Sequence, residues 1–151
     1  MIQMVHRSAL EDVVDAFGGS RELGEAGLRS YLDVDRLIHA GVPVSAFRHV
    51  IESLELPERT VVEGIGISRT TLGRRKQAGR LGFADSERAL RLGSVTALGK
   101  TVLGSTRAAG RWLLKPNAAL GGAVPLTLLQ TDFGARQVEA VLGRALLGGY
   151  S

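Results

Sequence analysis

The side chains best suited to chemistry lie in a basic stretch at residues 68–80 of the 151-residue chain. Arginine and lysine donate hydrogen bonds to phosphate oxygens, and arginine beside short polar side chains is the combination that reads base edges in the major groove of DNA. The residues expected on an exposed, DNA-reading helix face are Ser68, Arg69, Thr70, Gly73, Arg74 and Gln77. The residues expected to reach phosphates are Arg75, Lys76 and Arg80.

The basic excess of the chain is confined to its middle third. The formal net charge is +4, but residues 1–55 hold five basic and nine acidic side chains, whereas residues 56–115 hold twelve and four. Residues 116–151 are balanced at two and two. Nucleic-acid binding needs such a local excess. A solvated helical surface would give the same charge count, so charge alone leaves both interpretations open.

No set of residues has the spacing of a catalytic or metal site. The three histidines, His6, His39 and His49, form no pair with metal-ligand spacing, and the chain has no cysteine. Asp33 and Asp35 are two residues apart, so on a helix they point to different faces. The sequence therefore predicts a protein that is not an enzyme and that uses no metal or other cofactor.

The composition predicts an all-α protein. Hydrophobic residues make up 44% of the chain but aromatic residues only 5%, which favours a core of Leu, Val, Ile and Ala between packed helices. No sustained period-two alternation indicates a sheet. No apolar run reaches membrane-spanning length and no signal peptide is recognisable, so we expect a cytoplasmic protein without a membrane partner. About seven or eight helices are expected, beginning near Ser8, Ser30, Pro43, Pro57, Ser68, Asp85, Thr106 and Thr131.

The stretch from Glu58 to Arg75 has the layout of a helix-turn-helix. Gly66 lies where the turn needs a left-handed residue, and Ser68 is placed to cap the second helix. Val61, Ile65, Ile67 and Leu72 supply the apolar contacts between the two helices. Val62 is larger than the residue usual at its position, and Gly73 weakens the second helix by about 1 kcal/mol relative to Ala. A vestigial motif used only for packing therefore stays open beside real DNA contact.

The C-terminal stretch contains several residues that typically begin or end helices. Pro116 should end a helix that passes through Trp112, and the pair Gly121-Gly122 permits turns closed to most residues. Pro125 can open a short helical turn, and Thr131 is a good N-cap for a last helix. The face of that last helix expected to be buried carries Gly134, Val138, Val141, Leu142 and Ala145.

This stretch resembles the toxin-binding domain of MbcA/ParS/Xre-type antitoxins. The resemblance covers residues 112–150 without a gap, and many unlike residues agree in order and spacing. The matching positions are Trp112, Pro116, Asn117, Leu120, Gly121 (or Gly122), Pro125, Leu129, Thr131, Gly134, Val138, Leu142, Arg144 and Gly148. Antitoxins of this type carry an Xre-like helix-turn-helix domain before the toxin-binding one. We therefore divide the chain into an N-terminal arm and short helix (1–29), a helix-turn-helix domain (30–104) and a toxin-binding domain (105–151).

The resemblance implies the antitoxin of a type II toxin–antitoxin system, which neutralises a RES-domain, NAD-consuming toxin by direct binding and occlusion of its active site. It also implies repression of the antitoxin's own operon through operator DNA. A homodimer is expected because one small helix-turn-helix recognises its operator weakly. The residues implied in toxin binding are Trp112, Asn117, Leu120, Pro125, Leu129, Thr131, Val138, Arg144, Gly148, Gly149, Tyr150 and Ser151.

Two alternatives to the antitoxin stay open. One is a stand-alone helix-turn-helix repressor whose C-terminal helices serve only to dimerise. The other is a protein-interaction module that has lost DNA binding. A RES-type reading frame beside this gene would favour the antitoxin, and its absence would favour the repressor.

Overall fold

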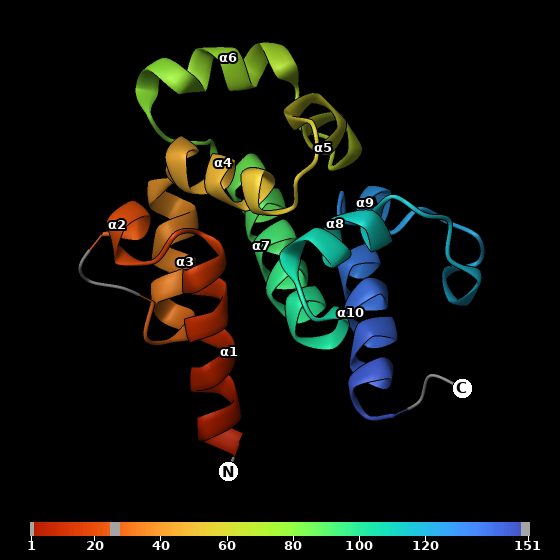
Figure 1. Cartoon of the computed structure of the whole chain (residues 1–151). Coiled ribbons are helices and arrows are strands. Elements are labelled where there is room, and N and C mark those ends of the chain that lie inside the picture. Colours follow the sequence, from red (N-terminus) through yellow and green to blue (C-terminus); the bar gives the residue numbers. More distant parts are fainter. Residues whose placement is uncertain (1, 25–27, 149–151) are drawn as a thin grey trace.

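The computed structural model describes residues 2–24 and 28–148, and this part of the chain is built from helices (Figure 1). The prediction of an all-α fold is confirmed. The described residues contain no strand, only an isolated bridge between Pro43 and Arg80. The helices are α1 (Ile2–Ala16), α2 (Ser20–Leu23), α3 (Tyr31–Ala40), α4 (Val44–Ser53), α5 (Glu58–Gly64), α6 (Arg69–Ala78), α7 (Phe83–Leu103), α8 (Thr106–Leu113), the 3₁₀ helix η1 (Ala118–Leu120), α9 (Pro125–Leu128) and α10 (Asp132–Leu146).

Helix α7 is the centre of the molecule. It contacts α1, α3, α4, α8 and α10, which surround it (Figure 1). Leu92 and Val95 of α7 are almost completely buried, and Leu98 and Val102 pack against the core from its margin. Gly93 allows α1 to come close, because a Cβ there would lie 2.3 Å from Cε2 of the buried Phe17. A single long helix therefore carries the N-terminal helices on one side and the C-terminal helices on the other.

Side-chain caps begin several helices where the sequence predicts them. The Ser68 hydroxyl accepts a hydrogen bond from the Thr71 N–H (3.3 Å) at the start of α6, and the Thr131 hydroxyl accepts one from the Gly134 N–H (3.0 Å) at the start of α10. At α3, the Asp33 carboxylate accepts hydrogen bonds from backbone N–H groups, chiefly that of Arg29 (2.9 Å). These bonds favour the charged carboxylate and lower the pKa of Asp33.

Two predicted helix starts are wrong. Helix α1 begins at Ile2, so Ser8 lies inside the helix and not at its N-cap. Residues 2–7 contain no Pro or Gly, so nothing in this segment prevents the helix from extending to its observed start. Helix α7 begins at Phe83 with Gly82 as N-cap, and Asp85 lies in the first turn. There Asp85 forms a 3.3 Å ion pair with Arg88 and does not cap the helix.

The described residues hold more helices than the seven or eight predicted. The difference comes from pieces of a single turn, which are α2, η1 and α9. Helix α2 falls in the segment 1–29, for which a single short helix was predicted, and α9 is the turn that Pro125 was expected to open. Such short pieces have too few residues to show a helical period, so the spacing of apolar residues does not reveal them.

Candidate DNA-binding and toxin-binding surfaces

Helices α5 and α6 form the predicted helix-turn-helix. Gly66 has a φ of 82°, the left-handed conformation that the turn requires. The Ile67 N–H then donates to the Val62 carbonyl oxygen (3.0 Å), which closes the turn before Ser68 caps α6. The apolar residues predicted to lie between the two helices are buried: Val61, Ile65, Ile67 and Leu72.

Helix α6 is attached to the protein by very little of its surface. Leu72 is its single buried side chain, and the helix lies across the top of the molecule in Figure 1, away from α10. The residues predicted to contact DNA are all exposed: Ser68, Arg69, Thr70, Arg74, Arg75, Lys76, Gln77 and Arg80. An exposed helix with one apolar anchor is the arrangement that major-groove insertion needs.

Two of these basic side chains already have partners in the free protein. Lys76 lies 3.5 Å from the Glu58 carboxylate, which also pairs with Arg48 at 3.2 Å. Arg80 donates a 2.7 Å hydrogen bond to the Gly41 carbonyl oxygen and so holds the segment after α6 against the segment before α4. In the described part of the chain, Arg69 and Arg74 form no ion pair. Their guanidinium groups are therefore not neutralised by a carboxylate of the free protein.

Helix α5 closely approaches α9 at Gly64. Val62 is buried and fits without a backbone irregularity. A Cβ on Gly64, however, would lie 2.5 Å from Cδ2 of Leu126 on α9. The Gln130 side-chain amide donates a 3.0 Å hydrogen bond to the Gly64 carbonyl oxygen at the same place. The helix-turn-helix therefore rests on the C-terminal helices through α5.

The loop between α8 and α9 is shaped by Asn117 and two glycines. The Asn117 side-chain oxygen accepts a hydrogen bond from the Ala119 N–H (2.9 Å), and its backbone oxygen accepts one from Gly122 (2.9 Å). Gly121 and Gly122 have φ values of 67° and 86°, which other residues rarely adopt. Asn117 is thus the structural centre of this loop.

The residues predicted to bind toxin fall into groups of different accessibility. Leu129 and Val138 are 0% exposed and Pro125 is buried, so these three build the core of the C-terminal part. Half-buried positions are Trp112, Asn117 and Leu120. Exposed positions are Thr131, Arg144 and Gly148. The predicted tail contacts at Gly149, Tyr150 and Ser151 lie outside the described residues.

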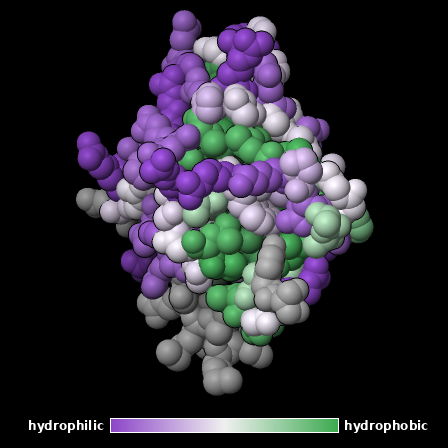
Figure 2. Space-filling view, turned by 45° about the vertical axis from the view of Figure 1, so that its right-hand side comes forward, coloured by the Kyte–Doolittle hydropathy of each residue, from purple (hydrophilic) through white to green (hydrophobic). Residues whose placement is uncertain are grey.

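Exposed apolar side chains on α10 are the feature that the sequence reasoning missed. Phe133 is 75% exposed, and Leu147, directly after the helix, is 88% exposed. Together with Gln137, Ala140 and Arg144 they recur every three or four residues, so they share the outer face of α10. We call these five residues the α10 outer face. Figure 2 shows hydrophobic areas exposed beside hydrophilic ones on the side of the molecule that holds the C-terminal helices. The signal in the sequence was a phenylalanine that lies off the buried stripe.

Neither a metal site nor a membrane span is found. No group of three His, Cys, Asp or Glu side chains within residues 2–24 and 28–148 could hold a metal ion. No helix in these same ranges is long and apolar enough to cross a membrane.

Comparison with known families identifies both parts of the chain. Residues 33–93 match the antitoxin Xre-like helix-turn-helix domain, and residues 98–146 match the antitoxin Xre/MbcA/ParS C-terminal toxin-binding domain. A helix-turn-helix unit followed by a toxin-binding unit defines an antitoxin of a toxin–antitoxin system. The chain belongs to the Xre/MbcA/ParS antitoxin family, as the resemblance of residues 112–150 predicted. A search of curated proteins gives no match.

Proposed function

We propose that this antitoxin neutralises a RES-domain, NAD-consuming toxin by binding it directly and blocking its active site, and that it represses its own operon by binding operator DNA. The observation that carries the proposal is the α10 outer face, which exposes the large apolar side chains Phe133 and Leu147 at the two ends of the last helix of the toxin-binding domain. The toxin class named in this proposal is the one that the family resemblance implies.

The charges on α10 favour a contact made mainly by apolar burial. Asp132 and Arg136 pair with each other at 2.8 Å, and Glu139 and Arg144 balance in formal charge, so the side chains of the helix carry almost no net charge. A well-buried Phe or Leu contact contributes about 1.5–3 kcal/mol in such an interface. Phe133 and Leu147 are the candidate anchors, with Arg144 between them as the polar contact.

Occlusion of the toxin is assigned to the C-terminal tail. Helix α10 ends at Leu146, and Gly148 turns the chain with a φ of 81°. Residues 149–151 follow, and Tyr150 is the large side chain among them. We assign entry into the active-site mouth to this segment, while the α10 outer face holds the complex together.

Operator binding is assigned to α6. The helix is basic and exposed, and it lies apart from α10 (Figure 1), so DNA and toxin would occupy different surfaces. A homodimer would place two copies of α6 in successive major grooves. Binding at the antitoxin's own promoter would then reduce transcription of the operon.

The test uses cells that express a candidate toxin, a RES-type reading frame sought beside this gene, with or without the antitoxin. Growth and the cellular NAD content are measured. Full-length antitoxin should restore both, and Phe133→Asp should restore neither while the variant stays folded. Phe83→Asp is the matched control, because Phe83 is also exposed, at 52%, but lies at the start of α7. Full protection by Phe133→Asp would contradict the role of the α10 outer face, and unchanged NAD with the toxin alone would contradict the assigned toxin class.

A further inference from the structure

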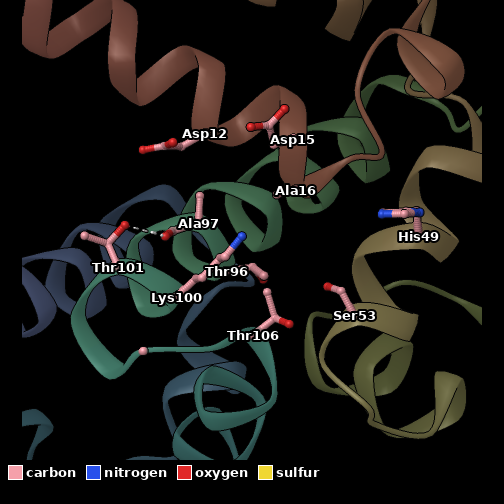
Figure 3. Close-up of a pocket in the computed structure, with 11 residues that line it drawn as sticks. Asp12, Asp15, Ala16, His49, Ser53, Thr96, Ala97, Lys100, Thr101 and Thr106 are labelled. Atoms are coloured by element: carbon pink, nitrogen blue, oxygen red, sulfur yellow. Dashed lines mark hydrogen bonds between the residues drawn. The ribbon is translucent and has the colours of Figure 1, made fainter.

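A pocket of about 380 Å³ lies between α1, α4, α7 and α8 (Figure 3). Helix α4 belongs to the matched helix-turn-helix segment, whereas α8 and the last turn of α7 belong to the matched toxin-binding segment. Helix α1 lies outside both matches and supplies one wall of the pocket. The pocket is therefore built from every part of the protein, and neither matched domain forms it alone.

Opposite charges face each other across this pocket. Asp12 and Asp15 are three residues apart on α1, so both carboxylates lie on one face of that helix. Lys100 extends from α7 on the opposite wall, and Figure 3 shows it below the two carboxylates. Among the described residues no ion pair of 4.0 Å or less joins Lys100 to Asp12 or Asp15. All three charged side chains are exposed, so each is accessible to a ligand in the pocket.

A buried hydroxyl without a partner lies on the α7 side of the pocket. Thr96 is 0% exposed, and its Oγ1 has no hydrogen-bond partner. The hydroxyl groups of Thr101 and Ser53 in the lining do have partners. Thr101 donates to the Ala97 carbonyl oxygen (3.3 Å), and Ser53 donates to the Val50 carbonyl oxygen (2.7 Å). A buried polar group without a partner is destabilising, so its presence points to a ligand that supplies the missing bond. Thr96 and Lys100 are four residues apart and share one face of α7.

We propose that this pocket binds a free basic amino acid. Beside the imidazole of His49, the lining offers two carboxylates and one ammonium group, and a basic amino acid has the complementary pattern of two cations and one carboxylate. Its carboxylate pairs with Lys100, and its two cationic groups pair with Asp12 and Asp15. The Thr96 hydroxyl is fully buried in the free protein, so it donates its hydrogen bond to the ligand carboxylate beside Lys100 only once side chains of the lining move aside on binding.

The first experiment is isothermal titration calorimetry of the full chain with L-arginine as the probe. Agmatine is arginine without the carboxylate, and citrulline is arginine without the guanidinium charge. Because a charge-assisted hydrogen bond contributes more than a neutral one, L-arginine should bind about tenfold or more tightly than either analogue. L-arginine should also raise the midpoint of thermal unfolding, because the pocket exists only in the folded protein.

Variants separate the two sides of the pocket. Lys100→Gln should remove the preference for L-arginine over agmatine and leave agmatine binding intact. Asp12→Asn and Asp15→Asn should each weaken both ligands by about tenfold. Lys115→Gln is the matched control, because Lys115 is an exposed lysine that does not line the pocket.

Thr96→Val distinguishes a binding role from a structural one. The substitution keeps the shape and removes the unpartnered hydroxyl, so the free protein should become more stable while L-arginine binds several-fold more weakly. Three results would overturn the proposal: no saturable binding of L-arginine to the full chain, agmatine binding as tightly as L-arginine, or unchanged affinity in both aspartate variants. Each of these readouts is independent of toxin and operator binding.

Discussion

Glu139 lies half-buried on α10, and its burial disfavours the charged carboxylate. Burial, with a smaller contribution from the nearby Asp132 carboxylate, raises the pKa of Glu139, although Arg136 acts in the opposite direction. An acid whose pKa is higher in the folded state binds its proton more tightly when folded. Its stabilising contribution is therefore present at low pH and is lost as pH rises through the folded-state pKa.

Replacement of Glu139 should therefore stabilise the protein at neutral pH. We expect Glu139→Gln to raise the free energy of unfolding by less than about 1 kcal/mol, because water screens a half-exposed group. The gain should vanish below the ordinary pKa of 4.5, where the carboxyl is protonated in both states. Urea unfolding at both pH values measures this, with exposed Glu52→Gln as the control. If Glu139→Gln raised the free energy of unfolding more in acid than at neutral pH, the raised pKa of Glu139 would be contradicted.

Two glycines on α10 should respond in opposite ways to the same substitution. A Cβ on Gly134 would lie 2.0 Å from the Leu128 carbonyl oxygen, whereas a Cβ on Gly143 meets nothing within 4 Å. Gly134→Ala should destabilise the protein by about 1–3 kcal/mol, because the backbone of α9 must move. Gly143→Ala should stabilise it by about 1 kcal/mol through helix propensity. Thermal unfolding of both variants is the measurement, and equal effects would contradict the close packing of α9 on α10.

At the scale of elements, two substitutions on α6 should weaken DNA binding in different ways. Arg74→Ala should cost about 1–3 kcal/mol at the operator and relax base preference at one position. Lys76→Ala should weaken all sequences alike and flatten the dependence on salt. Because Lys76 is partnered by Glu58 in the free protein, its net effect should be the smaller of the two.

Gel shifts on the region upstream of the gene, at two salt concentrations, would measure both losses. Arg136→Ala, a basic side chain on α10, is the control and should leave the shifts unchanged. Unchanged binding in the double variant Arg69→Ala/Arg74→Ala would exclude α6 as the recognition helix.

The sequence was sufficient for helix ends that depend on local chemistry. Ser68 and Thr131 cap helices as predicted because a hydroxyl needs only an N–H three residues ahead. The predicted start of α7 at Asp85 was wrong because Gly82 is the N-cap, and a glycine has no side chain that could indicate a cap in the sequence. The contacts of Gly64 and Gly134 were not predictable, since each depends on a partner brought close by the tertiary fold.

The surfaces were predictable to different degrees. The α6 face follows from one helix and its cap, so its exposed residues could be named from the sequence. The α10 outer face was missed because the buried and exposed faces of that helix both carry apolar residues. The pocket at Lys100 joins side chains from α1 and α7, which are far apart in the sequence, and no local pattern connects them.

For the whole molecule, toxin neutralisation and operator binding should be separable by removing the tail. A chain ending at Leu147 keeps all of α10, so it should fold and bind the operator like the full chain. It should protect cells from the toxin poorly, because no other segment can replace a tail that enters an active site. Growth assays and gel shifts on the same variant measure this. Full protection would move the blocking role to the α10 outer face near Arg144.

The assembly should be a dimer when it recognises DNA. Operator recognition by one small helix-turn-helix is weak, and two half-sites require two copies of α6. Light scattering of the protein, free and mixed with operator DNA, measures the mass. A monomer at micromolar concentration under both conditions would refute this prediction.

Because α7 runs through both matched segments, the two ends of the protein share one helix and cannot melt independently. Heating should then give a single transition whose calorimetric and van't Hoff enthalpies agree. Any molecule that binds only the folded chain raises the temperature of that shared transition. Operator DNA held by α6 would therefore protect the toxin-binding end from heat and proteases without touching it.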